Sequence, residues 1–75
     1  MNYDKEEILD VLDIIFEYNY PPTISNIIEE LRYSEEKVLS IIDILCSYEI
    51  ISYIDNEIEV LKDYEYASIL IGSLD

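Results

Sequence analysis

Residues 23–61 read TISNIIEELRYSEEKVLSIIDILCSYEIISYIDNEIEVL, and this stretch decides the fold that the sequence predicts. Its first nine residues, 23–31, have apolar side chains at the i, i+3, i+4, i+7 spacing of an amphipathic helix, namely Ile24, Ile27, Ile28 and Leu31. Thr23 is a suitable N-cap, because its hydroxyl can accept a hydrogen bond from the first turn. Three residues, Arg32-Tyr33-Ser34, then form a predicted tight turn.

A second helix is predicted over residues 34–48. Ser34 is its N-cap, and Glu35 and Glu36 lie in the first turn, where the helix dipole favours negative charge. The same apolar spacing recurs along this segment, at Val38, Ile41, Ile42 and Leu45. Two amphipathic helices joined by about three residues are typical of a helix-turn-helix.

A β-hairpin is predicted over residues 50–61, because Asp55-Asn56 is a two-residue turn of residue types that tolerate positive φ. In that register Tyr53 faces Ile58 and Ile51 faces Val60. One face of the hairpin is then apolar, and the other carries Ser52, Glu57 and Glu59.

Amphipathic helices are also predicted on both sides of this stretch. Residues 4–18 begin with Asp4 as N-cap, Glu7 completing a capping box, and a hydrophobic staple between Tyr3 and Ile8. Residues 63–74 carry one apolar side, made by Tyr64, Ala67, Leu70, Ile71 and Leu74. This side can be buried against the first helix or against a second copy of the chain. We expect a homodimer formed through it.

Composition sets limits on the function. The 75 residues fit one domain, and 18 acidic against 4 basic residues give a net charge of −14, which indicates either a solvated surface or a basic partner. With no His and one Cys, a structural zinc site and the usual general base near neutral pH are excluded. We expect no cofactor, no metal and no enzymatic activity. No apolar run nears the roughly 20 residues of a membrane span, and no signal peptide is recognisable, so a cytoplasmic protein is expected.

The whole pattern resembles the winged helix-turn-helix domains of small archaeal, bacterial or viral transcription regulators. The positions that carry the resemblance lie in residues 23–61, at Thr23, Ile24, Ile27, Leu31, Ser34, Val38, Ile42, Leu45, Ile51, Tyr53 and Val60. The resemblance implies a mainly α fold, with a three-helix core, a two-stranded wing at residues 50–61 and a C-terminal helix. It also implies that residues 34–48 are the recognition helix.

The charge departs from the DNA-binding members of that family, which have basic or amide residues on the recognition helix and the wing tip. Here the outer face of the helix carries Glu35, Glu36, Leu39, Ser40 and Asp43, and the wing tip carries Asp55, Asn56 and Glu57. Carboxylates repel phosphate, and DNA-binding proteins with strong salt dependence make about 6–10 phosphate contacts. DNA binding by the protein alone is therefore not expected.

The leading hypothesis is a regulatory module that acts through protein contacts, with a partner that has a basic surface. The residues expected to bind it are Glu35, Glu36, Leu39, Ser40, Asp43, Ile44, Asp55 and Glu57. Leu39 and Ile44 are included because they lie outside the apolar stripe. The alternative is that both pack against the wing or the first helix. Nucleic-acid mimicry, in which the carboxylates occupy a basic DNA-binding groove, is a narrower version of this hypothesis. The competing hypothesis is a homodimeric DNA-binding regulator. A third hypothesis is a purely structural dimer.

Overall fold

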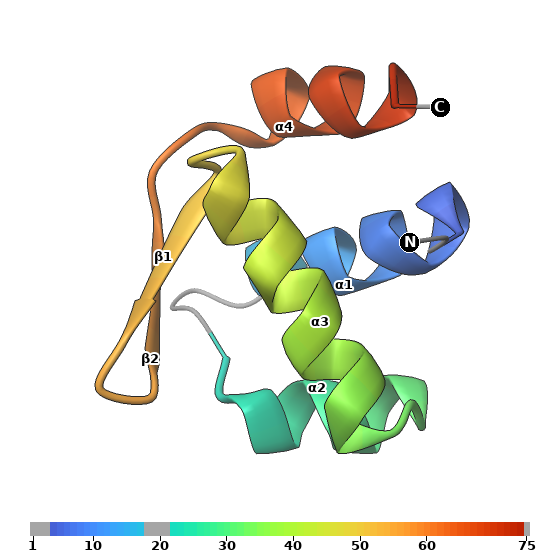
Figure 1. Ribbon diagram of the computed structural model, residues 1–75, viewed down its shortest axis with the longest axis vertical. Coiled ribbons are helices and arrows are strands. Elements are labelled where there is room, and N and C mark those ends of the chain that lie inside the picture. The colour runs from blue at the N-terminus through green and yellow to red at the C-terminus, as the bar shows by residue number, and fades with distance from the viewer. Residues whose placement is uncertain (1–3, 18–21, 75) are drawn as a thin grey trace.

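A computed structural model describes residues 4–17 and 22–74 of the chain, which form four helices and one two-stranded antiparallel hairpin (Figure 1). The elements are α1 (Lys5–Glu17), α2 (Ile24–Leu31), α3 (Glu35–Ser47), β1 (Ile51–Ile54), β2 (Glu57–Val60) and α4 (Tyr64–Gly72). The mainly helical class and the order of the elements are as predicted. The predicted end of the first helix at residue 18 and the staple through Tyr3 lie outside the described residues.

The helices begin at the residues whose side chains can cap them. Thr23, Ser34 and Asp63 each accept a hydrogen bond from the backbone N–H three residues later. Such a cap stabilises a helix by about 1 kcal/mol because it satisfies an otherwise unpaired donor. Before α1, the Asp4 carboxylate accepts from the Glu6 N–H at 3.1 Å. The Glu7 side chain, expected in a capping box, reaches across to α3 and pairs with Lys37.

The hairpin has the predicted register and turn. Ile51 pairs with Val60 and Tyr53 with Ile58. Both turn residues have positive φ, 56° at Asp55 and 64° at Asn56, which is the backbone of a type I′ turn and matches the right-handed twist of the strands. Ile51 and Ile58 are buried, while Glu57 and Glu59 on the other face are exposed. The hairpin therefore has one face on the core and one in solvent.

The core is formed around α1, which lies between α2 on one side and α4 on the other (Figure 1). Val11 and Leu12 of α1 are completely buried, as are Ile41 and Leu45 of α3. No polar or charged side chain of the described residues is buried, so the interior is wholly apolar. Such a core is held by the hydrophobic effect, at about 25 cal/mol per Å² of apolar surface removed from water.

The C-terminal helix α4 packs on α1 of its own chain. Ala67 and Ile71 have no exposed surface, and the Phe16 and Tyr64 rings meet edge to face with centroids 5.5 Å apart. The Tyr64 hydroxyl donates to Asp13 at 2.6 Å, and Lys5 Nζ donates to the Gly72 carbonyl at 3.0 Å, near the negative end of the helix dipole.

Two of the five residues of the predicted dimer surface, Ala67 and Ile71, lie within this packing, and the dimer itself stays a prediction. Ala67 and Ile71 are already buried inside the chain, so they cannot meet a second copy while α4 stays on α1. Leu70 and Leu74 are half-buried and pack against the same core, and Tyr64 is 43% exposed. The apolar side of α4 that motivated the dimer is therefore largely covered by α1.

Candidate functional site

The predicted partner-binding residues of α3 occupy its solvent side, but to different degrees. Glu35, Glu36 and Asp43 are exposed, and Leu39, Ser40 and Ile44 are half-buried. At the hairpin tip Asp55 and Glu57 are exposed. We call the five exposed carboxylates of Glu35, Glu36, Asp43, Asp55 and Glu57 the acidic face.

Leu39 and Ile44 do not belong to one apolar patch. They are five residues apart on a helix of 3.6 residues per turn, so their side chains point about 140° apart. Ile44 is half-buried and packs against the hydrophobic core. Leu39 lies on the other flank of α3, beside α2 and the hairpin. Leu39 therefore lies near the acidic face, and Ile44 does not form a common apolar surface with it.

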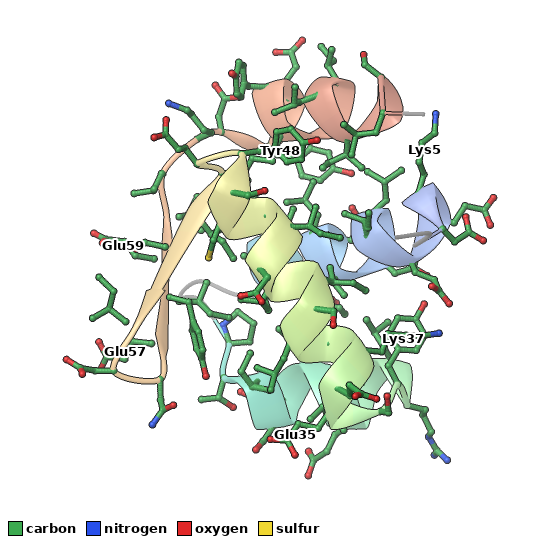
Figure 2. All side chains as sticks on the ribbon, viewed as in Figure 1. Lys5, Glu35, Lys37, Tyr48, Glu57 and Glu59 are labelled. Atoms are coloured by element: carbon green, nitrogen blue, oxygen red, sulfur yellow. The ribbon has the colours of Figure 1, made fainter. Side chains whose placement is uncertain are left out.

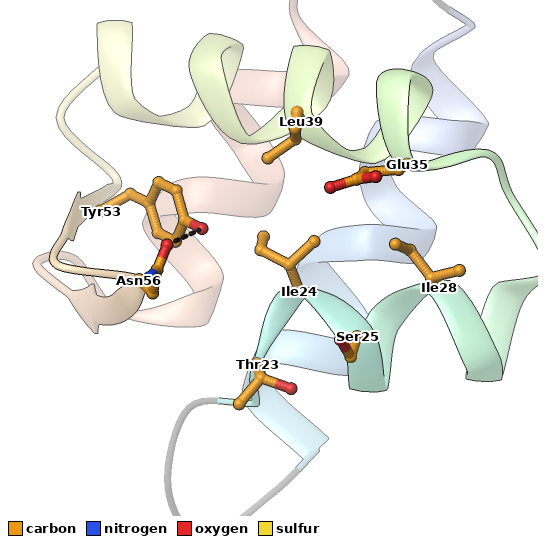
Figure 3. Close-up of a pocket in the computed structure, with 8 residues that line it drawn as sticks. All are labelled: Thr23, Ile24, Ser25, Ile28, Glu35, Leu39, Tyr53 and Asn56. Atoms are coloured by element: carbon orange, nitrogen blue, oxygen red, sulfur yellow. Dashed lines mark hydrogen bonds between the residues drawn. The ribbon is translucent and has the colours of Figure 1, made fainter.

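Leu39 forms part of a groove between α2, α3 and the hairpin, with a volume of about 560 Å³. Figure 3 shows its apolar side chains facing the same space, with Ile24 of α2 opposite Leu39 of α3 and the Tyr53 ring of β1 beside them. The polar residues around them are Thr23, Ser25, Glu35 and Asn56, and Ile28 completes the lining. The Tyr53 hydroxyl donates to Asn56 Oδ1 at 3.3 Å, which fixes the ring against the turn.

Ile24, Ile28 and Tyr53 pack against the core, as their apolar spacing indicated, and each also lines the groove. All three are only half-buried, and Ile27 is the one α2 residue that is completely buried. The apolar spacing of α2 is the same whether its neighbours cover a residue fully or in part, and α2 packs against both α1 and α3.

The four basic residues all lie away from the groove and the hairpin tip. Lys37 Nζ is 2.7 Å from Glu7 Oε2, and Figure 2 shows Lys37 on the α1 side of α3, away from Glu57. Lys62 Nζ lies 5.8 Å from the centroid of the Tyr66 ring. Lys5 bonds the end of α4, and Arg32 is the C-cap of α2, at the end of the helix away from Thr23. The ion pair that the structure shows among the described residues, Lys37 with Glu7, involves no carboxylate of the acidic face.

Tyr33, in the turn between α2 and α3, joins that turn to α1. Its hydroxyl donates to Asp10 Oδ2 at 3.1 Å, and Lys37 Nζ lies 5.0 Å from its ring centroid. Partial burial, and then the hydrogen bond to the Asp10 carboxylate, raise the pKa of Tyr33 to about 12. These contacts hold the start of α3 in place against α1.

The raised pKa of Tyr33 gives a first prediction. The folded state favours the neutral phenol, so its contribution to stability should be present below the usual tyrosine pKa near 10 and be lost as pH rises to about 12. The absorbance difference between the wild type and Tyr33→Phe isolates this residue in an alkaline titration. Asp10→Asn should lower the pKa, and Asp43→Asn should not. Titration of Tyr33 at its usual pKa would contradict the bond to Asp10.

Among the described residues, no cluster of His, Cys, Asp and Glu could hold a metal ion. Within the same residues, no helix is long and apolar enough to cross a membrane. No model of a protein family, no curated protein and no solved structure matches this chain. The site consists of exposed carboxylates next to a half-exposed apolar groove.

Proposed function

We propose that the chain is a non-catalytic winged-helix interaction module that binds a protein partner through a basic surface on that partner. In this proposal α2 and α3 are the helix-turn-helix, α3 is the recognition helix and β1–β2 is the wing. The support is the order of the elements, the short capped turn between α2 and α3, and a hairpin that follows α3 directly. The module would regulate its partner, which we expect to belong to transcription or other nucleic-acid machinery.

The observation that carries the proposal is the charge of the surface that a winged helix would present. Glu35, Glu36 and Asp43 are exposed along α3, and the basic residues are engaged or placed elsewhere. A carboxylate surface attracts Lys and Arg side chains and speeds association with a basic partner. The same charges could occupy a basic DNA-binding groove, so nucleic-acid mimicry is the narrower form of the proposal.

A DNA-binding regulator is the second candidate, and the order of the elements is what favours it. The charges disfavour it, because proteins hold duplex DNA largely by neutralising phosphates. A dimer would not remove the difficulty, since each copy adds a net charge of −14.

The second prediction separates these two candidates. At physiological salt the wild-type protein should not retain duplex DNA, with a Kd weaker than roughly 10⁻⁴ M, the weak end of ordinary non-specific binding. Gel shifts over a series of salt concentrations measure this. Glu36→Lys with Asp43→Lys should gain salt-sensitive retention if this face can approach a phosphate backbone. A sequence-specific nanomolar complex of the wild type, weakened by salt, would overturn the protein-partner proposal.

A further inference from the structure

The groove between α2, α3 and the hairpin leaves apolar surface in contact with water. Ile24, Leu39 and Tyr53 line it and are each half-buried. Ile24 and Tyr53 also pack against the core, whereas Leu39 is absent from that group of side chains. An apolar concave surface with a few polar groups around it can accept a side chain of another molecule.

The volume of the groove suits inserted side chains. It is about 560 Å³, and pockets that bind small ligands measure about 300–1,000 Å³. The groove has walls from three elements, and side chains of an extended or helical segment can enter it. The Ser25 hydroxyl and the Asn56 side-chain amide stand at its rim and can form hydrogen bonds to such a segment.

Charge decides which kind of segment fits. Glu35 lines the groove, and Asp55 precedes Asn56 in the hairpin turn. No Lys or Arg is among the lining residues that the structure describes. An acidic segment from a second copy of this chain would be repelled by these carboxylates, and so would a nucleic acid or an anionic membrane. The occupant must combine an apolar side chain with positive charge.

We propose that the groove binds a lysine- or arginine-rich peptide segment of the partner protein. One large apolar side chain of the segment inserts between Ile24, Leu39 and Tyr53. Its basic neighbours pair with Glu35 and with Asp55 at the hairpin turn. This rests on the proposed protein-binding function and specifies the chemistry of the partner. The apolar contact provides most of the affinity, because exposed ion pairs contribute little, while the charges select the partner.

Selection from a display library of random short peptides tests this directly. The recovered sequences should share one Leu, Ile, Met or aromatic residue flanked by Lys or Arg. A synthetic peptide with the recovered sequence is then titrated into the isotope-labelled protein and followed by NMR. Shifted signals should cluster at the groove residues. Replacing the apolar residue of the peptide by Ser should weaken binding about ten-fold, as expected for the loss of roughly 1.4 kcal/mol of apolar contact.

Variants of the protein provide matched controls. Ile24→Thr should weaken the peptide about five-fold or more, whereas Ile54→Thr, at a position that is 67% exposed on the outer face of the hairpin, should not. Glu35→Gln should weaken it about three-fold, and Glu65→Gln, in the first turn of α4, should have no effect. Because Glu35 is exposed, this second comparison stands even if Ile24→Thr unfolds the domain.

The outcomes separate the groove from the broader function. Recovered peptides without basic residues, shifts outside the groove, or equal binding of the Ser-substituted peptide would overturn the groove proposal. If Ile24→Thr and Glu35→Gln, both folded, still bind an identified basic partner at full affinity, the protein-binding function stands and the groove assignment fails. If no peptide is recovered and the protein binds duplex DNA, both proposals fail.

Discussion

Leu39→Arg is expected to abolish partner binding while leaving the fold intact. Leu39 is half-buried in the wall of the groove and lies outside the packed core, so a long side chain there can extend into solvent. The substitution removes an apolar contact worth about 1.5–3 kcal/mol, or roughly 10–100-fold in affinity. It also adds a positive charge that repels a basic partner.

The measurement is the affinity for a partner captured from native lysate and identified by mass spectrometry. Leu61→Arg is the matched control, because Leu61 is 48% exposed and follows the hairpin instead of lining the groove. Circular dichroism and thermal melting check that both variants are folded. Unfolding of Leu39→Arg would mean that Leu39 belongs to the core. Equal loss of binding in Leu61→Arg would place the partner elsewhere.

Ile71→Asp is expected to unfold the protein, whereas Ile69→Asp should leave it folded. Ile71 is completely buried against α1, and Ile69, two residues earlier on the same helix, is 63% exposed. Removing most of a buried Ile side chain costs about 2–5 kcal/mol, and an unpaired buried carboxylate adds to that cost. The total stability of small domains is about 5–15 kcal/mol, and a 75-residue chain buries little surface.

Chemical denaturation and light scattering on the two variants distinguish packing of α4 on α1 of the same chain from packing of α4 between two copies. If α4 packs on α1, Ile71→Asp loses helical signal and cooperative unfolding, while Ile69→Asp unfolds near the wild-type midpoint. A folded, monomeric Ile71→Asp from a dimeric wild type would instead show that the buried side of α4 is an interface between copies.

The capped helices and the hairpin could be predicted because their signals are local. Thr23 and Ser34 cap helices that the apolar spacing already indicated, since a cap bonds a backbone group only three residues away. The turn at Asp55-Asn56 fixed the hairpin register for the same reason. The acidic face was predicted in part, because charged residues outside an apolar stripe are solvent-facing on an isolated helix.

The sequence by itself determined the elements, their order and the excess of negative charge, all of which depend on neighbours within one or two turns. Only the tertiary structure decided what covers each apolar face. Ala67 and Ile71 pack against α1, and Ile44 packs against the core. Ile24, Leu39 and Tyr53 are half-exposed around a groove. Periodicity tells which residues share a face but not which surface meets it, because burial is set by elements distant in the sequence.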